Sequence, residues 1–132
     1  METQVKNKIL VVEDDVLQRY IAKSVLSEKF EVETANDGYE ALEMVEKNDY
    51  AYVLMDINLG DASMDGIKVM RMMRQNRRYK NTKIVAVTAH AHLRDWYISE
   101  GFNELIVKPI LSETVFNMLD QVPDVKNVYC FA

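Results

Sequence analysis

Five polar residues of this chain follow short apolar segments, and their types suit chemistry on a phosphoryl group. Glu13 and Asp14 follow one such segment, and Asp56, Thr88 and Lys108 each follow another. Three carboxylates that crowd together repel one another and favour a hard divalent cation such as Mg²⁺. A lysine ammonium and a hydroxyl can neutralise and orient phosphoryl oxygens. The combination predicts a metal-dependent site in which a carboxylate accepts a phosphoryl group.

Asp56 is the predicted acceptor among the three carboxylates. It follows the apolar segment 51–55 (AYVLM), which we expect to be a central strand beside the strand at 8–12 (KILVV). A carboxylate is a weak nucleophile toward phosphate because both partners are anions. A bound Mg²⁺ and the Lys108 ammonium would offset that repulsion.

Taken one at a time, these residues also have ordinary structural explanations. Asp14 or Asp15 can cap the helix that follows, and we adopt that interpretation for Asp15. Asp56 can be a turn residue at a strand end. Thr88 can be a β-branched strand residue, and Lys108 a solvated lysine at a sheet edge. All of these explanations must hold together to account for the set by accident, so the functional interpretation is favoured.

The elements that must position these residues alternate along the chain. The strand-like segments are 8–12, 31–34, 51–55, 83–87 and 104–107. Helices are expected at 16–28 (with Leu17, Tyr20 and Ile21 at helical spacing), after a cap at Asn36 or Asp37, around Ile67–Met73, at 92–100, and after a cap at Ser112. This alternation predicts an α/β fold with a parallel sheet covered by helices on both faces. Ligands of such sheets bind at the carboxyl edge, where all five polar residues would converge.

Length and composition set the frame for this site. The 132 residues fit a single domain, and a hydrophobic content of 48% is ample for a core. We expect one domain over 1–132, with a core at about 6–124 and an apolar tail at 125–132. The tail is compatible with packing back on the domain, with a homodimer contact, or with continuation of a longer chain.

Charge and cysteine usage exclude some classes of function. The net charge of −5 argues against a nucleic-acid surface. No apolar run approaches the ~20 residues of a membrane span, and the polar N-terminus does not resemble a signal peptide. Cys130 is the single cysteine, so an internal disulfide is excluded and a cytoplasmic location is predicted.

The region from Gly66 to Arg94 contains no acidic residue but eight lysines and arginines. A solvated helix whose cations favour its C-terminal end explains this pattern. A docking patch for an acidic partner is the alternative, and we favour the first explanation.

Five stretches of the sequence resemble the receiver domain of two-component response regulators. They are ILVVEDD (9–15), YVLMDINLG (52–60), MDG (64–66), IVAVTAHA (84–91) and VKPI (107–110). The resemblance covers nearly the whole chain. The motif TAHA (88–91) is similar to the corresponding segment in receivers of hybrid histidine kinases. It implies a flavodoxin-like fold with strand order 2-1-3-4-5 and five helices.

The resemblance also implies roles for individual residues. Asp56 would take the phosphoryl group from a phosphohistidine of a histidine kinase or a histidine phosphotransfer domain. The implied Mg²⁺ ligands are Glu13, Asp14, Asp56 and the backbone carbonyl of Asn58; the implied phosphoryl contacts are Thr88 and Lys108. Such a chain is not an enzyme toward other substrates, because it catalyses only its own phosphorylation and slow autodephosphorylation. Asn58 and His90 would flank the path of the attacking water, and the Lys108–Pro109 bond would be cis.

Two departures from the family pattern affect the expected switch. The loop after Asp56 is longer than usual and has Gly60 where a proline is common. Leu105 stands where relatives usually carry Tyr or Phe. We therefore expect Thr88 and the segment from Ala89 to Leu93 to carry the signal, while Leu105 stays packed.

Three rival functions share parts of this pattern. A flavodoxin-like electron carrier needs a glycine- and hydroxyl-rich phosphate loop after the first strand, where this chain has EDD. A phosphatase with an aspartate nucleophile usually carries that residue after the first strand, so Asp56 is misplaced for it. A degenerate receiver that only binds other proteins is the third, and the intact set of five residues argues against it.

Overall fold

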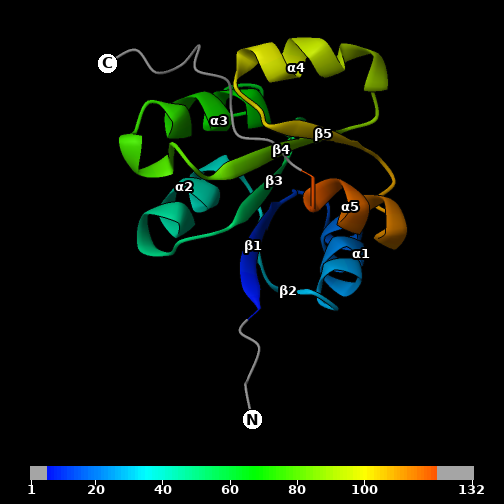
Figure 1. Ribbon diagram of the computed structural model, residues 1–132. Coiled ribbons are helices and arrows are strands. Elements are labelled where there is room, and N and C mark those ends of the chain that lie inside the picture. The colour runs from blue at the N-terminus through cyan, green and yellow to red at the C-terminus, as the bar shows by residue number, and fades with distance from the viewer. Residues whose placement is uncertain (1–5, 122–132) are drawn as a thin grey trace.

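The computed structural model describes residues 6–121, apart from the side chain of Thr114. Its strands are β1 (Asn7–Val12), β2 (Phe30–Ala35), β3 (Tyr52–Asp56), β4 (Lys83–Thr88) and β5 (Glu104–Val107) (Figure 1). Its α-helices are α1 (Val16–Leu26), α2 (Gly38–Lys47), α3 (Gly66–Arg74), α4 (Arg94–Glu100) and α5 (Ser112–Leu119), with 3₁₀ turns at Arg77–Tyr79 and Ala91–Leu93. The predicted alternation is confirmed, and the apolar tail at 125–132 lies outside the described residues.

The five strands form one parallel sheet in the order β2-β1-β3-β4-β5. This is the predicted order, and it places β2 at an edge and β3 at the centre. Asp56 is the last residue of β3 and lies opposite Val87 of β4. The reversal of strand order between β1 and β3 therefore falls beside Asp56, at the position where open α/β sheets bind ligands.

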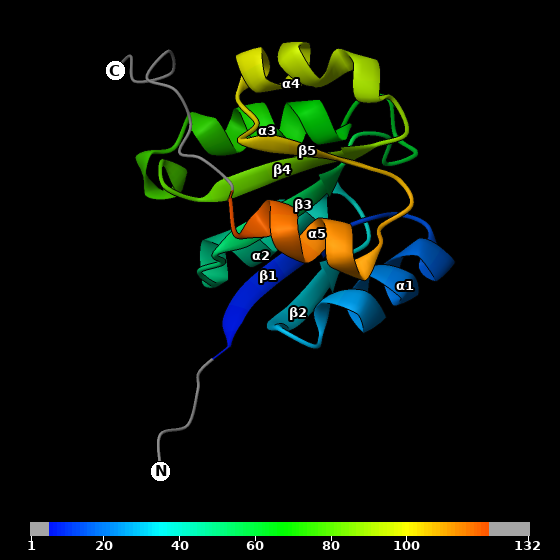
Figure 2. The ribbon, with the colours of Figure 1, turned by 45° about the vertical axis from the view of Figure 1, so that its right-hand side comes forward.

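Helices cover both faces of the sheet (Figure 2). Leu10 and Val12 of β1 pack on the face that α2, α3 and α4 cover. Ile9 and Val11 point to the opposite face and pack with α1 and α5. Because successive side chains of a strand alternate between faces, a strand buried on both sides is apolar throughout. This explains the unbroken apolar segments before the polar residues of the candidate site.

Aspartates begin three of the helices. The side chains of Asp15, Asp37 and Asp65 each accept a hydrogen bond from a backbone N–H in the first turn of α1, α2 and α3. The predicted caps at Asp15 and Asp37 are confirmed. The predicted cap at Ser112 is wrong, because Leu111 has the extended backbone of the N-cap position and Ser112 already lies in the helix.

The apolar residues that recur at helical spacing in α1 do not face the sheet. Leu17 is 63% exposed and Tyr20 is 70% exposed, whereas Ala22 and Leu26 pack in the core. The short Ala22 side chain lets the helix lie close to the sheet. The first half of α1 therefore presents a large apolar surface to solvent.

The basic region from Gly66 to Arg94 is partly neutralised within the molecule. Arg71 pairs with Glu100, and Arg94 forms a forked ion pair with Glu104 at 2.7 and 2.8 Å. Arg74 donates to the backbone carbonyl oxygens of Gly101, Tyr79 and Thr82. These contacts support the structural explanation of this region.

Within the described part of the chain, none of the helices has the length and apolar character needed to cross a bilayer.

Candidate functional site

Hydrogen bonds that continue beyond the strands bring the predicted residues to one edge of the sheet. Glu13 N donates to Ala35 O at 3.1 Å, which extends the pairing of β1 with β2. Lys108 N donates to Thr88 O at 2.9 Å, which extends the pairing of β5 with β4. Asp56 lies between them at the end of the central strand. Backbone hydrogen bonds alone thus bring the Cα atoms of these residues to the same end of the sheet.

The three carboxylates meet as the sequence predicts. Glu13, Asp14 and Asp56 each offer an oxygen atom, and these atoms all lie within 4.8 Å of one another. Glu13 and Asp56 are each 5% exposed, while Asp14 is exposed. Oxygen atoms this close could bind one divalent cation after small side-chain movements. Hard carboxylate oxygens with one solvent-facing member fit a cation that keeps part of its water.

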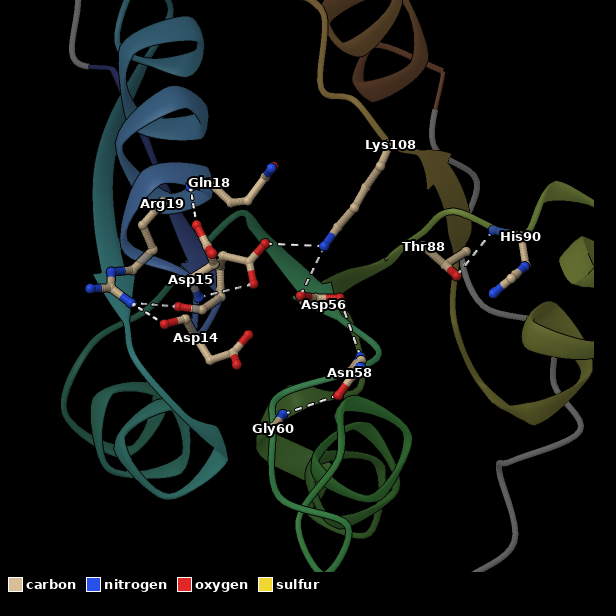
Figure 3. Close-up of polar contacts among 11 residues, drawn as sticks. Asp14, Asp15, Gln18, Arg19, Asp56, Asn58, Gly60, Thr88, His90 and Lys108 are labelled. Carbon is tan, nitrogen blue, oxygen red and sulfur yellow. Dashed lines mark hydrogen bonds and ion pairs between the residues drawn. The ribbon is translucent and has the colours of Figure 1, made fainter.

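Lys108 reaches into this cluster from the end of β5 (Figure 3). Its ammonium Nζ donates to Asp56 Oδ2 at 3.0 Å and to Glu13 Oε1 at 3.1 Å. The peptide bond between Lys108 and Pro109 is cis, as predicted. One ammonium beside three carboxylates leaves the site short of positive charge, which a divalent cation would supply.

Burial shifts the protonation of the buried members. Burial raises the pKa of Glu13 to about 8, and the neighbouring Asp56 adds to the rise while Lys108 opposes it. Burial alone would lower the pKa of Lys108, but its bonds to Asp56 and Glu13 raise that pKa overall. The pKa of Glu13 therefore rises because the group is buried beside another carboxylate, whereas the pKa of Lys108 rises because two carboxylates contact its ammonium.

The loop after Asp56 is built from two successive backbone contacts. Asn58 N donates to Asp56 Oδ1 at 3.2 Å, and Gly60 N donates to Asn58 Oδ1 at 3.1 Å. Gly60 has φ +78°, in the left-handed region that glycine adopts freely. Proline, which is fixed near φ −65°, cannot take this conformation. The backbone at position 60 therefore favours glycine and excludes proline.

The predicted phosphoryl contact Thr88 ends β4, and the predicted modulating residues lie after β3, after β4 and on β5. Thr88 is buried, and its hydroxyl accepts a hydrogen bond from His90 N at 3.2 Å. Ala89 and His90 are exposed, as is Asn58 on the far side of Asp56. Leu105 is buried in the core that α4 covers.

Two residues that support the site escaped sequence reasoning. Arg19 donates from one guanidinium nitrogen to the carbonyl oxygens of Glu13 at 2.9 Å and Asp14 at 3.1 Å. A cation near a helix N-terminus is unfavourable for the helix, and this could have marked Arg19 as serving another purpose. Gly66 packs directly on the carbonyl of Asp56, which leaves no room for a Cβ atom. Its backbone N–H also donates to Ile57 O at 3.0 Å.

Comparison with known proteins shows matches along most of the chain. The model of the Response regulator receiver domain family matches residues 9–120. The signal transduction histidine-protein kinase BarA of Shigella flexneri is 27% identical over 121 residues, which cover 89% of this chain and 13% of that protein. The chain thus spans a small part of the length of this curated relative.

Solved structures agree with this assignment. Chemotaxis protein CheY4 of Vibrio cholerae superposes with a TM-score of 0.80 at 29% identity, over 90% of this chain and 100% of that one. The receiver domain of a sensor histidine kinase from Pseudomonas aeruginosa, solved with a magnesium ion coordinated in its active site cleft, has a TM-score of 0.79 at 26% identity; the match covers 89% of this chain and 98% of that one. This chain belongs to the response regulator receiver domain family, the phosphoacceptor domains of two-component and phosphorelay signalling.

Proposed function

We propose that this chain is a Mg²⁺-dependent phosphorylation switch in which Asp56 accepts the phosphoryl group. The observation that carries the proposal is the meeting of Glu13, Asp14 and Asp56 within 4.8 Å, with the Lys108 ammonium on Asp56. Mg²⁺ would be held by these three carboxylates and the backbone carbonyl of Asn58. When bound, the ion would supply the positive charge that offsets repulsion between the acceptor and the phosphoryl oxygens.

The donor in this proposal is a phosphohistidine of a histidine kinase or a histidine phosphotransfer domain. An oxygen of the Asp56 carboxylate attacks phosphorus and forms a P–O bond as the P–N bond to the donor imidazole breaks. The imidazole nitrogen keeps the electron pair of that bond and takes a proton from solvent. Lys108 neutralises one phosphoryl oxygen, and the Thr88 hydroxyl donates a hydrogen bond to another. Asp56 is thereby converted to an acyl phosphate.

The surface beside the site suits a protein donor. Val16, Leu17 and Tyr20 project from the first half of α1, directly after the acidic pair, and are 63–72% exposed. Leu111, at the start of α5, is 58% exposed and follows Lys108 closely in the chain. Helices α1 and α5 cover the same face of the sheet (Figure 2). These exposed side chains of α1 and Leu111 form an apolar rim beside Asp56. A protein that brings its histidine to Asp56 could bury this rim, and burial of apolar surface is a main source of affinity between proteins.

The proposed domain acts only on itself, by taking up the phosphoryl group and later losing it to water. Asn58 and His90 are exposed on either side of the site and would flank the attacking water. Replacement of His90 by alanine should change the decay rate of the phosphorylated form. Identical decay curves would reduce His90 to an ordinary loop residue.

The scope of the proposal is one receiver domain over 1–132 with its core at about 6–124. The single cysteine suits a reducing compartment, so the proposal places the domain in the cytoplasm. The alternative is a degenerate receiver that binds partners without accepting phosphate, and the intact acidic cluster favours the first function.

A donor chase tests the proposal. A histidine phosphotransfer domain, labelled with ³²P on its histidine, is mixed with the chain in the presence of Mg²⁺ or of a chelator. The proposal predicts that label leaves the donor and appears on the chain only with Mg²⁺. If donors that charge other receivers leave this chain unlabelled, and acetyl phosphate does the same, the degenerate receiver is the better description.

A further inference from the structure

The carboxylate of Asp14 is the least anchored of the three. Glu13 and Asp56 are both held by Lys108, and Asp56 also accepts from Asn58 N. Over residues 6–121, the Asp14 carboxylate accepts no hydrogen bond and forms no ion pair, and its side chain is exposed. An exposed aspartate is free to change rotamer unless a neighbour restricts it. The position of this ligand must therefore depend on what it packs against.

Gly60 is what Asp14 packs against. A Cβ atom at position 60 would lie 2.8 Å from Asp14 Oδ2, a separation that Cβ atoms essentially never show. The carboxylate oxygen thus occupies space that exists because position 60 has no side chain. Gly60 is held there by its bond to Asn58 Oδ1, in a chain of contacts that starts at Asp56 (Figure 3).

We propose that Gly60 is a positioning residue for the Asp14 carboxylate, and that it sets the Mg²⁺ affinity of this domain. The inference rests on the proposed function, because it assumes that Asp14 is a metal ligand. A side chain at position 60 would displace the Asp14 carboxylate from the position that it takes beside Glu13 and Asp56. The glycine at position 60 then leaves room for the Asp14 carboxylate beside the other two acidic side chains.

Substitution of Gly60 has two effects that must be separated. The first is the loss of space for Asp14, and the second is the strain of a side chain at φ +78°. Asparagine tolerates the left-handed region better than alanine, yet it carries the same Cβ. Gly101 offers a matched control for strain, because it has φ +134° and a Cβ there would lie 2.8 Å from Met70 Sδ. Gly101 lies just before β5, at the amino ends of the strands, whereas the site lies at their carboxyl ends.

The test is a calorimetric titration of the unphosphorylated chain with Mg²⁺. Gly60→Ala and Gly60→Asn should both weaken Mg²⁺ binding by about 10-fold or more, the range seen when a partner that orients a metal ligand is lost. Gly101→Ala should lower the melting temperature and leave Mg²⁺ affinity unchanged. In an Asp14→Ala background, Gly60→Asn should have no further effect on Mg²⁺ affinity.

The outcomes separate the inference from the proposed function. If the wild-type chain does not bind Mg²⁺, the proposed function fails together with the inference. If the wild type binds and Gly60→Asn binds equally well, only the inference fails. The inference alone also fails if Gly60→Asn weakens Mg²⁺ binding by the same factor in the wild type and in the Asp14→Ala background. Should Gly60→Ala fail to fold, Gly60→Asn decides the question.

Discussion

The Lys108 ammonium lies 3.0 Å from Asp56 Oδ2, although the two residues are far apart in sequence. The same nitrogen also bonds to Glu13 Oε1, so one ammonium contacts two of the three carboxylates that would hold a metal ion. Lys108 therefore has two opposed effects in this account. It attracts the phosphoryl oxygens, and it repels a divalent cation at the same site.

The first prediction separates these two effects with Lys108→Met, which keeps much of the side-chain length and removes the charge. Phosphorylation by acetyl phosphate should slow by about 100-fold, the usual cost of losing one group that stabilises developing charge. Mg²⁺ should bind several-fold more tightly, because a nearby positive charge has been removed. Stopped-flow rates and a Mg²⁺ titration measure the two effects. Weaker Mg²⁺ binding together with an unchanged rate would contradict both assigned effects.

The second prediction concerns the acidic pair. Asp14→Asn should weaken Mg²⁺ binding by about 10-fold or more, because the neutral amide oxygen attracts the cation less than a carboxylate does. Phosphorylation should slow in parallel. Glu13→Gln should have a smaller effect, since the longer Glu13 side chain is expected to reach the ion through water.

The matched control for the acidic pair is Asp15→Asn. Asp15 lies in the same loop and caps α1, and asparagine is an equally good cap. This variant loses one negative charge without losing the helix cap. If Asp14→Asn and Asp15→Asn titrate alike, the effect is one of general charge, and Asp14 is not a ligand.

The third prediction tests the exposed rim of α1 as a docking surface. Leu17→Ser and Tyr20→Ala should slow transfer from a phosphorylated histidine phosphotransfer domain by about 10-fold, as for anchors at the centre of an interface. Transfer from acetyl phosphate should not change, because this small donor does not touch the helix. Met72→Ser serves as control, since Met72 is 40% exposed on α3, on the other face of the sheet. Equal slowing with both donors would show that the helix affects the site itself.

The fourth prediction concerns how the signal leaves the site. Leu105 is 3% exposed, and a buried leucine gains about 1.5–3 kcal/mol over an exposed one, so it should keep one packed rotamer in both states. Thr88 and the segment from Ala89 to Leu93 should move instead, because His90 N donates to the Thr88 hydroxyl and links the segment to any movement of Thr88 toward the phosphoryl group. Methyl NMR spectra with and without beryllofluoride measure both. A Leu105 that leaves the core while 89–93 stays still would overturn this account.

Sequence reasoning recovered the fold because the apolar segments are unambiguous. Strands buried on both faces appear as continuous apolar runs, and β5 (Glu104–Val107) coincides with its predicted range. Helix starts were less certain. Ser112 is a good capping residue by type, but the backbone at Leu111 places the cap one residue earlier. The segment 92–100 divides into a 3₁₀ turn and α4, a distinction that side-chain periodicity does not encode.

The candidate site was predictable in its members but not in its contacts. That Glu13, Asp14 and Asp56 meet follows from their places at strand ends, and the structure confirms that they do. The contacts of Arg19 and Gly60 depend on the conformation of the loops after β1 and β3. Gly60 and Asp14 meet although they are far apart in sequence, so local sequence does not predict their contact. The exposure of Leu17 and Tyr20 was also hidden, because an apolar stripe on a helix ordinarily marks the side that faces the core, and here these two side chains face solvent.

The central claim is that Asp56 is the phosphoacceptor, and intact-mass measurement after incubation with acetyl phosphate and Mg²⁺ tests it most directly. Asp61→Asn is the matched control, because Asp61 is an exposed aspartate of the same loop and asparagine can still accept the hydrogen bonds from Ser63. The account predicts one added phosphoryl group on the wild type and on Asp61→Asn, and none on Asp56→Asn. Uptake by Asp56→Asn at the wild-type rate would contradict it.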